Sequence, residues 1–242
     1  MTVSTATATG RLPRVDLDFR MLRLPGVYRP QADTALLAEA AAAAPIPPGA
    51  RVLDMYTGSG ALAVVAARLG AGEVTAVDVS LRAVMSVRFN AWARGLPVRA
   101  RRGSLVEPVS AASGRASADR LYDVVLANPP YVPCPSAAAP TGRDRAWDAG
   151  PHGRAVLDLF CAAAPGLLSA AGFVLLVHSH VSGVERSLQM LRASGLRTSV
   201  TARRRVPFGP VMRARAAYLE DAGLIRRGQR HEDLVVIRAE HA

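Results

Sequence analysis

The residues best suited to carry chemistry are four consecutive positions, Asn128, Pro129, Pro130 and Tyr131. They follow an apolar run, residues 122–127, whose composition is typical of a buried parallel strand. Two successive prolines keep Asn128 out of the helical region, so the strand must end there. Ligands of open α/β sheets bind at that edge. A carboxamide, proline carbonyls in need of donors and an aromatic ring would suit a planar group that carries an NH2, although two prolines can also simply end a strand.

A glycine-rich turn offers a second candidate site, in this case for a ligand. The sequence D-x-x-T-G-S-G at 54–60 joins an expected strand, residues 51–56, to an expected helix, residues 61–69. This order is typical of dinucleotide-type binding units, because glycines let the backbone approach a ligand and the helix N-terminus presents free N–H groups. The motif is not G-x-G-x-x-G and lacks the Gly-Lys-Ser/Thr of a phosphate loop. A ligand with a carboxylate and a ribose therefore fits better than a triphosphate.

An acidic residue, Asp78, ends the next expected strand, residues 73–78. It lies about 20 residues past the glycines, where an acid accepts hydrogen bonds from ribose hydroxyls in dinucleotide-binding folds. The same residue could be a solvated loop acid or could cap the following helix. Because the glycine-rich turn stands at the right distance before it, we favour the ribose-binding interpretation.

Hydrophobic patterning predicts the other elements of one α/β domain. The expected strands cover residues 51–56, 73–78, 98–101, 121–127, 171–177, 196–206 and 233–238, and the expected helices cover residues 35–44, 61–69, 80–94, 153–169 and 183–194. We expect a flexible leader over residues 1–20, with a short strand near 17–19, and a single domain over residues 21–242.

Several connections carry further expectations. Asp33 or Thr34 is expected to be the N-cap of the first helix. Residues 107–120 are expected to form a loop or a weak helix, and residues 207–228 a basic insertion with a helical middle. The long segment 132–150 leaves the presumed site and is interpreted as a substrate-facing lid. Its Trp147 could fold back over the site or pack in the core, and we leave both open.

Composition limits the class of protein. Of the 242 residues, half are hydrophobic and a fifth are charged, as in ordinary globular proteins. Cys134 and Cys161 form no CxxC pair and no His/Cys cluster has zinc spacing, so we predict neither a structural metal nor a disulfide. We interpret His178 and His180 as structural. No signal-peptide pattern and no apolar run of about 20 residues is present, which predicts a cytoplasmic protein with no membrane partner.

The net charge is +11, and every basic residue is an arginine. Such a surface suits an acidic or nucleic-acid partner. Over-use of Ala, Gly, Pro and Arg together is also a sign of coding bias, and we leave both interpretations open. Residues 203–205 form a basic patch, which is more often a solvated edge than a binding site.

The order of these parts resembles a class I S-adenosylmethionine-dependent methyltransferase over about residues 22–238. The resemblance implies a Rossmann-like, doubly wound α/β sheet of seven strands, mostly parallel with the last strand antiparallel. Segment 54–60 is similar to the first motif of that family, and segment 128–131 to the catalytic motif of enzymes that methylate exocyclic or amide nitrogen. By this resemblance, S-adenosylmethionine would be the cofactor. It would be bound by Thr34, Asp54, Tyr56, Thr57, Gly58, Gly60, Asp78, Ser104, Leu105 and Asn128, with Asn128, Pro129, Pro130 and Tyr131 as the catalytic residues.

More narrowly, the chain resembles the HemK-like glutamine-N5 protein methyltransferases. This resemblance rests on residues 28–34, on the D-x-x-T-G-S-G form of the turn and on residues 147–153. It implies that the substrate is the glutamine of the Gly-Gly-Gln loop of a translation release factor. The chain has no room for the helical domain of the longer bacterial members, so it looks more like the short branch, whose members pair with a small activating subunit. Ser104 stands where the family usually has an acid bonded to the adenine amino group.

The resemblance also suggests a mechanism. An amide nitrogen is a poor nucleophile because its lone pair is delocalised into the carbonyl. The Asn128 side-chain oxygen and the Pro129 carbonyl could accept both N–H hydrogens, fix the nitrogen for attack and stabilise the positive charge that grows on it. Tyr131 would stack on the flat substrate.

Other functions remain open at this point. A nucleic-acid adenine-N6 or guanine-N2 methyltransferase would use a similar motif, but the chain has no aromatic-rich basic run that would mark an RNA-binding module. A non-catalytic cofactor-binding protein and a small-molecule methyltransferase are further alternatives. We favour a protein glutamine as the methyl acceptor and a nucleic acid as the second choice.

Overall fold

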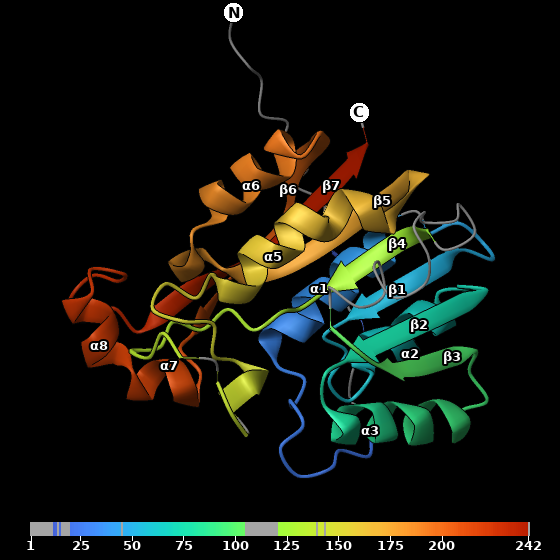
Figure 1. Ribbon diagram of the computed structural model, residues 1–242, viewed down its shortest axis with the longest axis horizontal. Helices are drawn as coiled ribbons and strands as arrows, with labels where there is room; N and C mark the ends of the chain where they lie inside the picture. Colours follow the sequence, from blue (N-terminus) through green and yellow to red (C-terminus); the bar gives the residue numbers. More distant parts are fainter. Residues whose placement is uncertain are drawn as a thin grey trace, which may run out of the picture.

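The computed structural model describes residues 12–13, 15, 20–44, 46–104, 121–138, 140–142 and 144–241. Within them, one seven-stranded sheet contains β1 (Arg51–Met55), β2 (Glu73–Asp78), β3 (Val98–Arg102), β4 (Tyr122–Ala127), β5 (Leu168–Ser179), β6 (Leu196–Pro207) and β7 (His231–His241). The strand order is β3-β2-β1-β4-β5-β7-β6 (Figure 1). Strands β1 to β5 pair in parallel, whereas β7 is antiparallel to β5 and β6. The mostly parallel, doubly wound sheet that the sequence predicts is confirmed.

The sheet core explains why the central strands are continuous apolar runs. Val124 to Ala127 of β4 are completely buried, because helices cover both faces of a parallel sheet. Along β4, Val124 packs in the apolar cluster on one face and Val125 in the cluster on the other. The edge strand β6 differs: its burial is interrupted and it carries the exposed Arg203 and Arg205.

Seven α-helices lie in the described part of the chain. They are α1 (Ala32–Ala43), α2 (Ala61–Arg68), α3 (Leu81–Trp92), α5 (Ala155–Ala163), α6 (Val184–Ala193), α7 (Pro210–Ala214) and α8 (Ala216–Asp221), with short 3₁₀ turns η2 (Asp144–Ala146), η3 (Ala164–Leu167) and η4 (His180–Ser182). Helices α1, α2 and α3 bury apolar side chains on one face of the sheet, and α5 and α6 on the other (Figure 1). No helix of the described residues is long and apolar enough to cross a membrane.

The expected N-cap of the first helix is wrong. Helix α1 begins at Ala32, and Gln31 is its N-cap without a side-chain cap bond. Asp33 and Thr34 lie buried inside the first turn. Their side chains do not cap the helix, because they bond to each other and to residues of the site described below.

The helix expected over residues 153–169 is also too long. Helix α5 ends at Ala163, and the chain passes through η3 into β5 at Leu168. Pro165 and Gly166 account for this end, because proline removes a backbone donor and glycine is a weak helix former. The short strand expected near residues 17–19 and the loop or weak helix expected over residues 107–120 lie outside the described residues.

A smaller apolar cluster packs α7 and α8 against the segment after β4. It contains Val132, Val181, Phe208, Met212, Leu219 and Ile225. Main-chain bonds join the two ends of segment 132–150: Val132 N donates to Trp147 O over 2.8 Å, and Ala149 N donates to Val132 O over 3.1 Å. The Tyr218 hydroxyl of α8 donates to the Cys134 and Pro151 carbonyls. The ends of the expected lid are therefore fixed to the helices that follow β6.

Candidate active site

The sheet brings the two sequence motifs together. Strands β1 and β4 are parallel neighbours, and Met55 pairs with Ala127. The glycine-rich turn and the Asn128 motif therefore leave the sheet side by side at its carboxyl edge. Asp78 follows at the end of β2, on the other side of β1. This edge is where ligands bind in open α/β sheets.

Asp54 holds the glycine-rich turn through buried hydrogen bonds. Its Oδ2 atom accepts hydrogen bonds from Thr57 Oγ1 over 2.5 Å and from Ala63 N over 3.0 Å, and the residue is fully buried. Burial raises the pKa of Asp54 from 3.8 to about 7, against the lowering effect of these two bonds. Asp54 thus holds the turn in place, and a direct contact with a ligand stays a prediction.

Glycines are required at two positions of the turn. Gly58 has φ 55° and Gly60 has φ 86°, both in the left-handed region that favours glycine. A Cβ on Gly60 would lie 3.1 Å from the Val87 side chain, a tight contact that α3 could accommodate only by a small shift. The surface of the turn is consequently bare backbone, as expected for a segment that approaches a ligand closely.

Tyr56, just before the turn, is strained and incompletely bonded. It has φ 59°, which costs a non-glycine residue about 1–2 kcal/mol. Its ring meets Phe160 edge to face at 6.3 Å, and its buried hydroxyl has no hydrogen-bond partner among the described residues. Burial raises the pKa of Tyr56 well above its ordinary value. Strain and an unsatisfied donor at one residue are typical of functional positions.

Asp78 closes the other side of the turn. Its Oδ2 accepts from Gly58 N over 3.0 Å and its Oδ1 from Ser80 N over 2.8 Å. Burial raises the pKa of Asp78, and the two backbone bonds oppose that rise. Ser104 lies two residues beyond β3, whose last residue pairs with Asp78. Leu105, which the sequence also assigned to this site, lies outside the described residues.

A relay of hydrogen bonds orients Asn128. Thr34 Oγ1 donates its only proton to Asp33 Oδ1 over 3.1 Å, so its oxygen can only accept from a further partner. That partner is Asn128 Nδ2, at 3.4 Å. The amide group of Asn128 therefore turns its NH2 toward α1 and leaves its carbonyl oxygen for a different donor.

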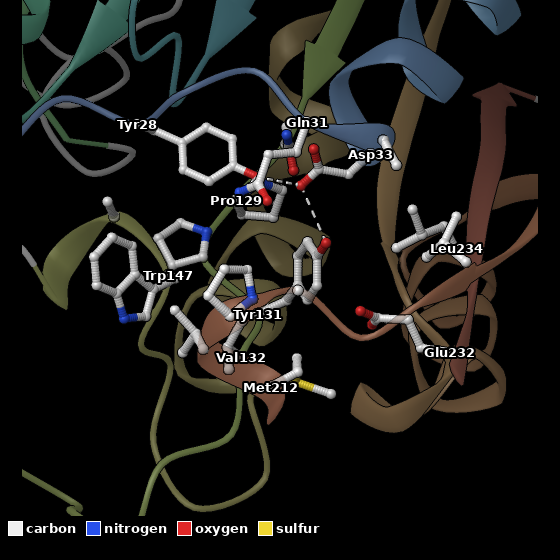
Figure 2. Close-up of a pocket in the computed structure, with 18 of the residues that line it drawn as sticks. Tyr28, Gln31, Asp33, Pro129, Tyr131, Val132, Trp147, Met212, Glu232 and Leu234 are labelled. Carbon is white, nitrogen blue, oxygen red and sulfur yellow. Dashed lines mark hydrogen bonds between the residues drawn. The ribbon is translucent and has the colours of Figure 1, made fainter. Parts of the chain in front are cut away.

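The same carboxylate positions two tyrosines. Asp33 Oδ2 accepts from Tyr28 over 2.7 Å and from Tyr131 over 3.1 Å (Figure 2). Asp33 is only 4% exposed, so these bonds form in a low-dielectric setting. Burial is the main cause that raises the pKa of Tyr131, and the Asp33 charge adds to it. Both phenols therefore stay protonated at neutral pH.

These residues line a cavity of about 130 Å³. Its walls include the whole motif from Asn128 to Tyr131. In Figure 2, Trp147 and Glu232 lie on opposite sides of Tyr131, with Met212 below it. Glu232 is 7% exposed, and its Oε2 atom has no partner among the described residues. Burial raises the pKa of Glu232. The cavity is small beside the roughly 300–1,000 Å³ typical of pockets for drug-sized ligands, and it suits a single side chain.

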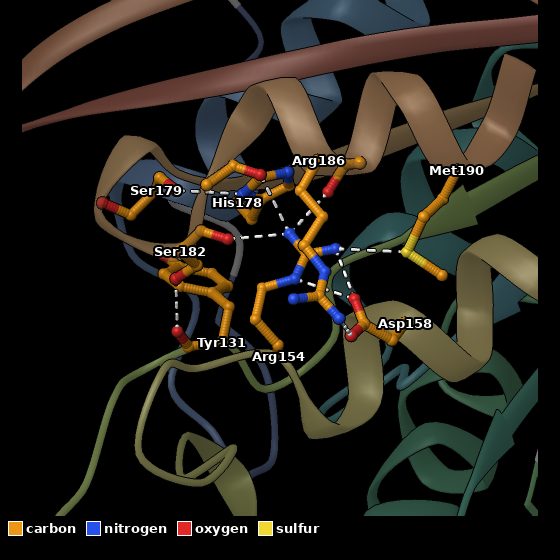
Figure 3. Close-up of polar contacts among 10 residues, drawn as sticks. Tyr131, Arg154, Asp158, His178, Ser179, Ser182, Arg186 and Met190 are labelled. Atoms are coloured by element: carbon orange, nitrogen blue, oxygen red, sulfur yellow. Dashed lines mark hydrogen bonds and ion pairs between the residues drawn. The ribbon is translucent and has the colours of Figure 1, made fainter.

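The motif is also held from the side of α5 and α6. Ser182 Oγ donates to the Tyr131 carbonyl over 2.6 Å, and Arg154 Nη1 donates to the Ser182 carbonyl over 2.7 Å (Figure 3). Arg154 is buried and ion-paired with Asp158. Gly153 lies against the same carbonyl, because a Cβ there would collide with the Tyr131 oxygen. The backbone of the motif is therefore fixed on both sides of the sheet.

Sequence reasoning missed part of this site. Glu232 was not singled out, because it reaches the cavity only through the pairing of β6 and β7, where it faces Val206. Met212 comes from the insertion after β6 and gave no local signal. His178 and His180 serve local structure: Nδ1 of His178 contacts the Ser179 carbonyl at 2.9 Å, and Nδ1 of His180 accepts from Asp233 N. Burial lowers the pKa of His178 to about 4.

Comparison with known proteins gives a consistent set of relatives. The family model described as methyltransferase small domain matches residues 18–139. A candidate protein N5-glutamine methyltransferase from Methanocaldococcus jannaschii is 29% identical over 196 residues, which cover 78% of this chain and 90% of that protein. A release factor glutamine methyltransferase from Bordetella pertussis is 36% identical over 185 residues, which cover 72% of this chain and 64% of that protein. The chain thus spans somewhat less than two thirds of this second relative.

A solved structure has the same fold. It is the E. cuniculi Mtq2–Trm112 complex responsible for methylation of the eRF1 translation termination factor, with a TM-score of 0.61 and 22% sequence identity. The match covers 90% of this chain and 99% of the solved chain. At this identity the match establishes the arrangement of the sheet and helices.

Asp54 makes the stability of the protein depend on pH. Because its folded-state pKa of about 7 is above the ordinary value of 3.8, its stabilising effect is complete below about pH 4 and is lost as the pH rises to 7. The loss is on the order of 4 kcal/mol. In Asp54→Asn, which cannot ionise, we expect the free energy of unfolding to change much less between pH 4.5 and 7.5. Urea unfolding at both pH values measures this difference.

The control for this comparison is Asp221→Asn, which removes one exposed carboxylate at the end of α8. It should leave the pH dependence of the wild type unchanged. An equal pH dependence in the wild type and Asp54→Asn would show that Asp54 does not titrate in this range.

Proposed function

The chain belongs to the methyltransferase small domain family, and on that premise we propose that it methylates the side-chain amide nitrogen of a protein glutamine with S-adenosylmethionine as donor. The names of the two relatives support this acceptor. The observation that carries the proposal is the oriented carboxamide of Asn128, whose carbonyl oxygen is left for a donor at the edge of the sheet. We place the reaction in the cytoplasm, and a release-factor Gly-Gly-Gln loop is the acceptor that we favour.

The residues of the carboxyl edge fit the cofactor. Gly58 and Gly60 present bare backbone, Asp78 presents a carboxylate for hydroxyl groups, and the buried Tyr56 hydroxyl has no partner in the part of the chain that the structure describes. We propose that these residues, with Thr57 and Ser104, hold S-adenosylmethionine. When bound, the cofactor supplies an electrophilic methyl group on its sulfonium.

The chain's contribution to the reaction is orientation and charge stabilisation. The Asn128 carbonyl oxygen and the Pro129 carbonyl accept the two N–H hydrogens of the acceptor amide, which fixes the nitrogen for attack. The same two oxygens stabilise the positive charge that develops on nitrogen. Tyr131, held by Asp33, forms an aromatic wall beside the flat amide. No ionised base is needed before the methyl group moves.

Asn128→Ala tests this role. We expect the rate of methyl transfer to fall by at least about 10³-fold, because the transition state loses the Asn128 oxygen that accepts an N–H hydrogen of the acceptor amide. The measurement is transfer of labelled methyl from S-adenosylmethionine into a Gly-Gly-Gln release-factor peptide, with mass spectrometry of the product. Cofactor binding, followed by calorimetry, should survive in part, because Asn128 is only one of the residues expected to bind the cofactor. Thermal unfolding should stay close to wild type. Ser136→Ala, in the exposed part of segment 132–150, should keep wild-type turnover.

Two results would contradict the proposal. Normal turnover by Asn128→Ala would exclude the amide role of that residue. Label that enters RNA or DNA of a cell extract, and not protein, would replace the acceptor class by a nucleic-acid base while keeping the same site. We carry that nucleic-acid methyltransferase as the second candidate function.

We propose that Glu232 binds the part of the acceptor protein that lies next to the glutamine. A hydrogen bond from Ser179 lowers the pKa of the Glu232 carboxyl, but its Oε2 atom has no partner among the described residues and is buried in the wall of the cavity that faces the Asn128 motif. A buried carboxylate oxygen without a donor is unfavourable. We propose that an N–H of the acceptor protein, next to the glutamine, donates to it. A charge-assisted bond of this kind contributes about 1.5–3 kcal/mol.

Glu232→Gln should therefore separate binding from stability. We expect KM for the peptide to rise about tenfold with kcat nearly unchanged, while the free energy of unfolding rises by about 1 kcal/mol. Glu39→Gln is the control, because Glu39 is equally buried but ion-paired with Arg204. It should lower stability and leave KM unchanged. An unaltered KM in Glu232→Gln would contradict the proposed contact.

A small activating subunit is the partner that we propose for this enzyme. The related fold of Mtq2 was solved in complex with Trm112. In the present chain, α3 exposes four large apolar side chains at helical spacing, namely Leu81 (54% exposed), Met85 (52%), Phe89 (46%) and Trp92 (75%). The Phe89 and Trp92 rings lie 5.9 Å apart. A continuous apolar stripe of this kind is typical of a protein-binding surface.

The surroundings of the stripe indicate an acidic partner. Strand β3 beside it is the end of the sheet, and among the described residues no further strand pairs with its outer edge, which could accept one. Arg82, Arg88 and Arg101 are exposed around the stripe and form no ion pair within the described residues. A second copy of a chain with net charge +11 would meet like charges there, which disfavours self-association.

Trp92→Ser tests the partner surface. Tagged chain is expressed in its host, the co-purifying small protein is identified, and the complex is reconstituted from purified parts. We expect the partner to raise kcat for the wild type, and Trp92→Ser to weaken its affinity at least tenfold. Leu159→Ser is the matched control, since Leu159 is 60% exposed on the distant helix α5. A concentration-dependent dimer of the purified wild type that Trp92→Ser abolishes would instead make the occupant a second copy.

A further inference from the structure

A second crevice lies away from the acceptor cavity, on the other face of the β6–β7 ladder. Arg205, His231 and Asp233 line this crevice, whereas their neighbours Val206, Glu232 and Leu234 line the acceptor cavity. The alternation follows from the strand geometry, in which successive side chains point to opposite faces. The crevice has a volume of about 670 Å³, and the turn after α8 forms its remaining wall.

Two N–H donors lie close together in this crevice, and the described residues place no acceptor between them. His180 Nδ1 accepts from Asp233 N over 2.9 Å, so the ring must carry a proton on Nε2. Gln229 is fixed as well, because its Oε1 accepts from Arg226 N over 3.2 Å and its Nε2 donates to His231 O over 2.9 Å. The His180 Nε2 and Gln229 Nε2 atoms lie 3.5 Å apart. A shared acceptor atom between them would satisfy both donors.

Positive charge surrounds this donor pair. Arg205, Arg226 and Arg227 line the crevice, are exposed and form no ion pair with an acidic side chain in the described part of the chain. The one acid of the crevice, Asp233, is within 3.5 Å of Arg203. The crevice therefore offers guanidinium groups and neutral N–H donors, with little negative charge to balance them.

We propose that this crevice binds a phosphate group. Phosphate has three or four oxygens that point in different directions, and the donors here come from η4, from β6 and from the turn after α8. A carboxylate has only two oxygens and would leave part of this set unused. The phosphate can belong to a small phosphorylated molecule or to an RNA backbone, and both use the same contacts. The inference does not depend on the proposed methyl transfer.

Binding of inorganic phosphate is the first test. Calorimetry at low salt should detect phosphate binding to the wild-type chain. The double variant Arg226→Ala/Arg227→Ala should bind phosphate at least tenfold more weakly. Gln229→Leu, which keeps the net charge, should bind it several-fold more weakly. The double variant Arg101→Ala/Arg102→Ala removes the same charge at β3, the opposite edge of the sheet, and should bind like the wild type. An equal loss of phosphate affinity in both double variants, or wild-type phosphate affinity in Gln229→Leu, would overturn the proposed phosphate site.

The second test identifies the source of the phosphate. Fluorescence anisotropy with a labelled single-stranded RNA 12-mer is measured over a series of salt concentrations. The site is assigned to an RNA backbone if two results are found together. The wild type must bind RNA more tightly than inorganic phosphate, and RNA binding by Arg226→Ala/Arg227→Ala must depend less on salt than RNA binding by Arg101→Ala/Arg102→Ala. Phosphate binding without RNA binding assigns it to a small ligand. Binding of neither probe overturns the proposal. Methyl transfer to the peptide should be unchanged in Arg226→Ala/Arg227→Ala and in Gln229→Leu, so a failure of the proposed function is scored separately.

Discussion

The carboxylate of Asp33 is the interaction on which the candidate site depends. It accepts from Tyr28 and Tyr131 on one oxygen and from Thr34 on the other. Because a carboxylate can only accept, it determines the direction of the Thr34 hydroxyl and, through it, the face that Asn128 presents. One buried charge thus sets both the aromatic wall and the free acceptor of the site. Burial strengthens each of these bonds, since no water competes for the donors.

Other residues near this centre are locally unfavourable. Tyr56 has a strained backbone, and within the described structure its buried hydroxyl and one buried oxygen of Glu232 have no hydrogen-bond partner. In a folded protein most buried polar groups are bonded, so such exceptions concentrate where a ligand completes the set. Their positions agree with this view, because Tyr56 adjoins the glycine-rich turn and Glu232 lines the cavity beside the Asn128 motif. Hydrogen bonds from Arg154 to Ser182 and from Ser182 to the Tyr131 carbonyl hold the Asn128 motif in place beside these two unsatisfied groups.

Sequence predicted the parts of the site that are local in the chain. The prolines after Asn128 and the glycines at 58 and 60 act through their own backbone, and the strands that carry them were predicted to within a few residues. The mistaken N-cap at Asp33 shows the limit of that reasoning. A short acidic residue before an alanine-rich helix is usually a cap, but the partners of this one include Tyr131, which is 98 positions away. Glu232 gave no local signal for the same reason, because register between β6 and β7 places it.

The arginines of this chain differ in their surroundings and therefore in their roles. Arg154 is buried and binds carbonyls and a carboxylate between α5 and α6, so it belongs to the fold. Arg204 and Arg215 are ion-paired with Glu39 and Asp148. Arg226 and Arg227, in the wall of the second crevice, form no ion pair within the described residues, and Asp233 is the one acidic side chain that lines the same crevice. Net charge alone could not separate coding bias from binding, because it averages over these environments. An unbalanced guanidinium beside fixed neutral donors is a local feature, and only a local anion neutralises it.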